Sequence, residues 1–172
     1  MPDKKIMAGG AVLFGAAFWF YIKPNYLESP PPPVYTEEQI AQAPRPTIFL
    51  GKAAPHSGAD DPGVVFNLKS PTSSPNYVKV VLALEFGDPL HKYIGAVGAG
   101  VEAKNHVFAE ELQPEMHKIL DAITSTFGDK SIDDVSTTGG REKLKAEIVK
   151  AVNAQLHHEQ VTTVYFSTFI TQ

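Results

Sequence analysis

The sequence predicts an α+β domain that follows an N-terminal membrane-spanning helix, and three observations lead to this prediction. Residues 6–22 contain no charged side chain, which is typical of a helix that crosses a bilayer. A later segment has an apolar residue at every second position, which is the period of a β-strand, and two further segments repeat apolar residues at helical spacing. The resulting order, strand, strand, helix, helix, strand, indicates the α+β class.

The composition excludes several kinds of function. The chain has 172 residues, which is enough for one ordinary domain with extensions. It carries 19 acidic and 15 basic side chains, whereas a nucleic-acid-binding surface requires a basic patch. There is no cysteine, so disulfides, thiol nucleophiles and thiolate metal sites are excluded.

The apolar segment Ile6–Ile22 is predicted to be an uncleaved membrane anchor, with residues 1–5 in the cytoplasm. A helix of this length spans roughly 25 Å, slightly less than a hydrocarbon core of about 30 Å, and the flanking lysines can reach the two surfaces. A secretory signal peptide is the alternative, but the segment ends in bulky residues rather than a small-x-small cleavage site. The lysines preceding the segment favour a cytoplasmic N-terminus. The predicted anchor residues are Ile6, Val12, Phe14, Phe18, Trp19 and Ile22.

Residues 23–63 are predicted to be a proline-rich linker. The run Pro30–Pro33 favours polyproline II, which is a stiff spacer. Thr36 and Gln39 fit a capping box that opens a short helix over residues 37–43. Polyproline can also be a ligand for an aromatic groove, but a spacer needs only reach.

The folded domain is predicted to cover residues 64–172 and to begin with two paired strands. The first strand is expected at residues 64–70, and turn-forming residues separate it from the second at residues 77–86. The second strand has a strictly alternating apolar face, made of Val78, Val80, Leu82, Leu84 and Phe86. Residues 87–108 are expected to be a loop or a bulged strand, because their glycines do not follow the dinucleotide-binding pattern.

Two amphipathic helices and a final strand complete the predicted domain. The first helix has an apolar stripe that consists of Leu112, Met116, Ile119, Leu120, Ile123 and Phe127, with Pro114 in its first turn. The second helix, residues 141–158, turns Leu144, Ile148, Val149, Val152 and Leu156 inward. The strand at residues 161–172 has apolar residues on both faces, so it is predicted to lie inside the sheet. Removing the residues from Phe169 onward should then unfold the domain.

No residue pattern points to catalysis, a cofactor or a metal. The histidines are not at metal-binding spacing and there is no HExxH motif. No G-x-S-x-G nucleophile motif occurs either. Acidic pairs at residues 110–111 and 133–134 are interpreted as helix caps and solvated side chains. These observations favour a binding or scaffolding protein.

The ordered segments together resemble the FliL family of flagellar basal body-associated proteins. The most specific likeness is the closing pattern V-Y-F-[ST]-x-F-[VI]-x-Q at residues 164–172, followed by the L-E-F ending of the long strand and an upstream Asn-Leu pair. The residues that carry the resemblance are Asn67, Leu84, Glu85, Phe86, Val164, Tyr165, Phe166, Phe169 and Gln172.

This resemblance implies a single-pass protein of the inner membrane, whose domain lies in the periplasm at the flagellar basal body. It implies a stomatin/prohibitin-like domain with a small sheet and two main helices. The implied partners are the MotA/MotB stator and further copies of the chain, arranged as a ring that supports stator activity in motility. Neither catalysis nor a small-molecule substrate is implied.

Two departures from the family pattern and two alternatives remain. The family's Thr-Pro-Glu-Gly-like turn before its second helix is replaced by residues 137–140, Thr-Thr-Gly-Gly, so a looser helix start is expected. The segment at residues 91–106 is longer than usual, which leaves its role open. The alternatives are a stomatin-like scaffold unrelated to flagella and a membrane-anchored periplasmic enzyme of unrecognised type.

Overall fold

The computed structural model of the chain describes residues 33–52, 62–71 and 75–172. The predicted membrane anchor and the first part of the predicted linker lie outside these residues. In the part of the chain that is described, no helix combines the length and the apolar character needed to cross a membrane. The chain divides after Thr36 into two units, the second of which is residues 37–172.

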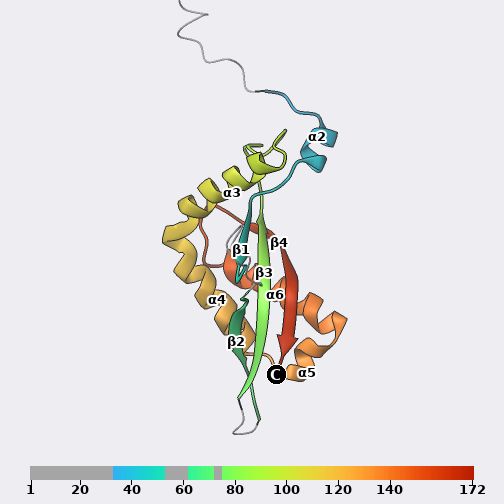
Figure 1. Ribbon diagram of the computed structural model, residues 1–172, viewed down its shortest axis with the longest axis vertical. Helices are drawn as coiled ribbons and strands as arrows, with labels where there is room; N and C mark the ends of the chain where they lie inside the picture. The colour runs from blue at the N-terminus through green and yellow to red at the C-terminus, as the bar shows by residue number, and fades with distance from the viewer. Residues whose placement is uncertain (1–32, 53–61, 72–74) are drawn as a thin grey trace, which may run out of the picture. The chain divides into compact units, whose positions relative to one another are not determined.

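Residues 37–172 form an α+β unit with a small antiparallel sheet, which confirms the predicted class (Figure 1). In chain order its elements are α2 (Glu37–Gln42), β1 (Thr47–Leu50), β2 (Val64–Leu68), β3 (Asn76–Phe86), α3 (Ala99–Leu112), a 3₁₀ turn (Gln113–Glu115), α4 (Met116–Gly128), α5 (Ile132–Ser136), α6 (Thr138–Asn153) and β4 (Val161–Thr171).

The central strand of the sheet is β3, and all its pairings are antiparallel. Figure 1 shows β4 along one edge of β3, and β1 and β2 one after the other along the opposite edge. The predicted pairing of the first two strands is confirmed as β2 with β3. Strand β1 lies inside the range predicted as linker, and this part of the prediction is wrong. Strand β1 has only four residues, which are too few to show the period of a strand, and it directly follows a proline-rich stretch.

The prediction that the last strand lies inside the sheet is also wrong. Among the described strands, β4 pairs with β3 alone, so it is an edge strand. Its two apolar faces arise from two register shifts, one of which leaves Ser167 without a partner on β3. Because a bulge changes which residues face inward, Val161, Val164, Phe166 and Phe169 all contact the core despite their uneven spacing.

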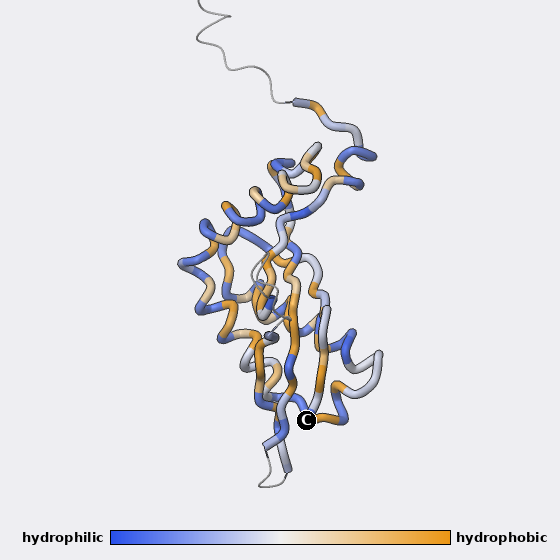
Figure 2. The backbone as a smooth tube through the Cα atoms, viewed as in Figure 1, coloured by the Kyte–Doolittle hydropathy of each residue, from blue (hydrophilic) through white to orange (hydrophobic). Residues whose placement is uncertain are grey.

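The core lies between one face of the sheet and the helices α4 and α6. Figure 2 shows hydrophobic residues along the middle of β3 and along the neighbouring part of α4. The predicted inward face of β3 is confirmed, since all five of its apolar residues are fully buried. The ring of Phe127 stacks on Phe66, with ring centroids 4.6 Å apart. One residue of the predicted stripe, Leu120, is instead 36% exposed.

The helical region differs from the prediction at three places. Helix α3 occupies a stretch that was expected to be a loop or bulged strand, and it continues through the 3₁₀ turn, which contains Pro114, into α4. Its apolar residues are not confined to one side and only Leu112 is buried, so helical periodicity gave no signal. Helix α5 was not predicted, and α6 ends at Asn153, before the two adjacent histidines.

The start of α6 is capped rather than loose, contrary to the expectation from its Gly-Gly sequence. The hydroxyl oxygen of Thr137 accepts a hydrogen bond of 3.0 Å from the backbone N–H of Gly140. A Cβ atom on Gly140 would lie 1.9 Å from the carbonyl oxygen of Asp134, whereas no heavy atom lies within 4 Å of a Cβ on Gly139. Gly140 is therefore the residue that permits α5 and α6 to meet.

Replacing these two glycines should have opposite effects on stability. We expect Gly140→Ala to destabilise the domain by about 2–3 kcal/mol, because the new methyl group overlaps backbone. Gly139→Ala should leave the stability unchanged or raise it by up to about 1 kcal/mol, because alanine favours the helix. Urea unfolding of both variants measures the difference. Equal stability of the two variants would contradict this account of the α5–α6 contact.

Candidate functional site

The residues that carry the sequence motif belong to the frame of the sheet and do not converge on one site. Leu84, Phe86 and Val164 are buried in the core, and the rings of Phe166 and Phe169 pack against it. The others lie elsewhere: Asn67 is exposed on β2, Glu85 lies 3.9 Å from Arg45, Tyr165 points outward, and the backbone of Gln172 pairs with Tyr77. Most of the motif residues therefore lie on β3 and β4, and the motif reflects the pairing of these two strands.

Residues 33–52, 62–71 and 75–172 contain no group of three or more histidine, aspartate or glutamate side chains that could hold a metal ion. Two features of this region that can bind a partner are an apolar sheet face and a pocket.

The sheet face that points away from the helices carries a group of exposed apolar side chains, which we call the outer sheet face. Strand pairing places Phe49 and Tyr165 on either side of Ala83, and Val65 and Ile170 on either side of Lys79. The four exposed residues have 44–58% of their surface accessible, and they are Phe49, Val65, Tyr165 and Ile170. Between them, Val81 and Ala83 are buried, and neither belongs to the core cluster on the helix side of the sheet. Clustered apolar groups on an open sheet face are typical of a contact with another protein.

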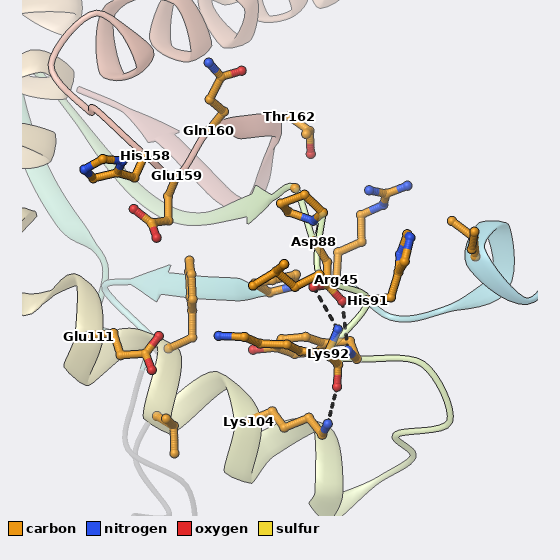
Figure 3. Close-up of a pocket in the computed structure, with 18 of the residues that line it drawn as sticks. Arg45, Asp88, His91, Lys92, Lys104, Glu111, His158, Glu159, Gln160 and Thr162 are labelled. Carbon is orange, nitrogen blue, oxygen red and sulfur yellow. Dashed lines mark hydrogen bonds between the residues drawn. The ribbon is translucent and has the colours of Figure 1, made fainter. Parts of the chain in front are cut away.

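The pocket has a volume of about 910 Å³ and lies between residues 87–93, helix α3 and the segments that lead into β1 and β4 (Figure 3). Its walls include the apolar side chains of Ile40, Pro46, Leu90, Val107 and Phe108. Its charged residues are Arg45, Asp88, Lys92, Lys104, Glu111 and Glu159. Both signs of charge are present in equal number, so these six side chains together carry no net formal charge.

Hydrogen bonds hold the loop that forms one wall of the pocket. The carboxylate of Asp88 accepts from the backbone N–H groups of Lys92, at 3.0 Å, and Tyr93, at 2.8 Å. The ammonium group of Lys104 on α3 donates to the carbonyl oxygen of Lys92 (Figure 3). Three contacts from two elements therefore fix this wall of the pocket before anything binds.

Tyr93 is the most unusual residue of the pocket. Its side chain is only 3% exposed, yet its hydroxyl group has no hydrogen-bond partner among the described residues. Burial raises the pKa of Tyr93 to about 12, and the negative charges of Asp88 and Glu111 contribute to the same shift. The phenol is therefore protonated at neutral pH and is a hydrogen-bond donor without an acceptor.

Sequence reasoning did not find this pocket. Its lining comes from segments that are far apart in the chain, and the glycine-bearing stretch that supplies Tyr93 has no period. The stretch contains Leu90, Tyr93 and Ile94 among its glycines, but nothing in the sequence distinguishes these side chains as the lining of a pocket.

Comparison with known proteins gives a family match and a similar curated protein. The sequence profile of a family described as "Flagellar basal body-associated protein FliL" matches residues 60–172. A protein named "Flagellar protein FliL" from Aquifex aeolicus (strain VF5) is 29% identical over 110 residues, which cover 60% of this chain and 68% of that protein. The matched range includes the β3–β4 pairing and α3, whereas β1 and the residues before it lie outside the range.

Proposed function

Because this chain belongs to the FliL family of flagellar basal body-associated proteins, we propose that it associates with the MotA/MotB stator and supports stator activity in motility. The family consists of flagellar accessory proteins and is not a known enzyme family. Membership also speaks against the alternative of a scaffold unrelated to flagella. The stator partnership rests on the resemblance described above, and the surfaces of the domain supply its physical basis.

The proposed topology is a single-pass protein of the inner membrane. Residues 6–22 anchor the chain, residues 1–5 remain in the cytoplasm, and the proline-rich linker holds a stomatin/prohibitin-like domain in the periplasm. The apolar character of residues 6–22, without one charged side chain, supports this proposal. An anchored domain can act on a membrane-embedded stator because the linker limits the distance between them.

The outer sheet face is the observation on which the proposed assembly depends. Copies of the domain pack side by side, and Tyr165 and Ile170 of each copy contact a different surface of the next copy. Both side chains are nearly half exposed and lie on an edge strand, so a second copy can reach them without unfolding anything. Repetition of such a head-to-tail contact closes into a ring when the rotation between neighbours permits it.

A ring activates the stator only if it discriminates between stator states. It must bind the active state more tightly than the inactive one, because equal affinity for both would shift no population. The free energy for this discrimination comes from the differential contacts of many copies with one stator. A variant that cannot assemble should therefore lose stator activation even though its domain is folded.

Replacing the exposed residues of β4 tests this proposal. We expect the double variant Tyr165→Ser, Ile170→Ser of the full-length chain to assemble at least tenfold more weakly, because the contact loses its apolar side chains. Light scattering measures the assembly, and swimming of a deletion strain that carries the variant measures the function. Co-purification of MotB with the wild-type chain tests the partner.

Leu120→Ser provides the matched control, because Leu120 is also exposed but lies on α4, away from the outer sheet face. This variant should assemble and restore swimming like the wild type. Unchanged assembly of the double variant would refute the outer sheet face as the contact. Absence of MotB from the purified wild-type complex would refute the stator partnership.

A further inference from the structure

We propose that the pocket between α3 and residues 87–93 binds a peptide segment of a partner protein, which inserts an uncharged aliphatic side chain and offers a backbone carbonyl oxygen to the Tyr93 hydroxyl. This inference goes beyond the proposed function, because neither family membership nor the outer sheet face assigns a role to the pocket. Its support comes from the size, the apolar rim, the buried hydroxyl and the charges of the pocket.

The pocket has the dimensions and the rim of a binding site. Its volume of about 910 Å³ is within the range of pockets that enclose small ligands or a few side chains. Two of its lining residues are large and exposed, with 73% of Leu90 and 54% of Val107 accessible. Exposed apolar groups around a concave site can be covered by the same partner that fills the site.

The hydroxyl of Tyr93 requires an acceptor that the described residues do not provide. Buried polar groups are nearly always hydrogen-bonded, so an unpaired one at the wall of a pocket indicates a missing partner. The hydroxyl is protonated at neutral pH and has an oxygen that can also accept. The hydroxyl oxygen is itself buried, so a ligand oxygen reaches it by displacing the side chains that cover it, and the hydrogen bond then formed is one that the described residues do not supply.

Charge decides between the kinds of acceptor. Asp88 and Glu111 are the acidic groups that raise the pKa of Tyr93, so the hydroxyl lies in a negative potential. A carboxylate or phosphate placed against it would be repelled, whereas a neutral amide carbonyl would not. The rim also presents Lys92 as well as Glu111 and Glu159, so it suits the alternating donors and acceptors of a peptide better than a lipid headgroup.

The site is preorganised for such a ligand. The hydrogen bonds of Asp88 fix residues 88–93 from within the loop, and Lys104 joins the loop to α3. A partner therefore has to order little of this wall when it binds, which lowers the entropic cost of binding.

Titration with a small blocked amide tests the proposal on the full-length chain. The probe is N-acetyl-leucine N-methylamide, which has one aliphatic side chain and neutral carbonyl groups. In isotope-labelled protein we expect saturable NMR shifts at Leu90, Tyr93 and Val107. N-acetyl-leucine, which carries a carboxylate, should bind at least fivefold more weakly than the amide.

Three variants separate the hydroxyl from the pocket walls. Tyr93→Phe should keep the fold and weaken the probe five- to tenfold, because it removes only the hydrogen bond. Val107→Asp should abolish binding by placing a charge on the apolar rim. Leu120→Asp changes an exposed apolar residue that does not line the pocket, so it should bind the probe like the wild type.

Several outcomes would overturn the proposal. The absence of saturable shifts, or equal affinity in Tyr93→Phe, would show that the hydroxyl has no role in binding. Tighter binding of the free acid would contradict the neutral acceptor. Displacement of the probe by phosphatidylglycerol vesicles but not by unlabelled peptide amides would identify a lipid site instead.

Discussion

Removal of Phe169–Gln172 is expected to destabilise the domain by about 4 kcal/mol or more. The deletion removes the ring of Phe169 from the edge of the core, where its centroid lies 5.1 Å from that of Phe166. It also removes both hydrogen bonds, each 2.9 Å long, between the backbones of Gln172 and Tyr77. Phe169 is partly buried, so loss of its ring costs about 2–3 kcal/mol, less than a fully buried ring would, and each lost backbone hydrogen bond adds about 1 kcal/mol.

This loss is comparable to the whole stability of a typical domain, about 5–15 kcal/mol. We therefore expect the truncated chain to be largely unfolded at growth temperature, as the sequence predicted, although β4 is an edge strand. Circular dichroism during thermal unfolding measures the effect. Ile170→Ser is the control, because that side chain lies on the outer sheet face and should cost less than about 1 kcal/mol. A truncated chain with a wild-type melting temperature would contradict the packing of β4 described here.

Substitution of Phe127 by alanine should be nearly as damaging, with an expected loss of about 3–5 kcal/mol. The ring is fully buried and lies parallel to Phe66, with an angle of 3° between the rings. It also contacts Phe166 of β4, at a centroid distance of 6.4 Å, so it joins α4 to two strands. The cavity left by alanine would therefore weaken both edges of the sheet at once.

Urea unfolding at equilibrium measures the effect of Phe127→Ala. Phe49→Ala is the matched control, because it removes the same atoms from a ring that is 44% exposed on the outer sheet face. The control should lose less than about 1.5 kcal/mol. If the two variants were equally stable, the core between the sheet and α4 would have been placed wrongly.

The elements that the sequence predicted well are those with a long, regular period. Strand β3 has an apolar residue at every second position from Val78 to Phe86, and α4 repeats apolar residues at spacings of three and four. Their buried faces follow directly from the geometry of strands and helices. The errors lie where this geometry is interrupted or where the element is short. The bulges in β4 mix its two faces, and β1 is too short to show any alternation.

Helix α3 shows a different limit of sequence reasoning. It buries only Leu112 and extends along the unit with most of its side chains in solvent, so it needs no apolar stripe. Its glycine-containing N-terminal end lowers helix propensity further. The pocket could not be predicted for the same reason, because α3 forms one of its walls.

Family membership, the α+β class, the inward face of β3 and the helix α4 could all be derived from the order and period of the residues. These features depend on neighbours along the chain, and local geometry determines them. The edge position of β4, the outer sheet face and the pocket around Tyr93 depend on which distant segments come together. The pocket residues Arg45, Tyr93, Val107 and Glu159 belong to four different segments. These segments come together at one end of the sheet only in the folded domain. Chain order contains no signal for such contacts, since the free energy that places them comes from burial of the core as a whole.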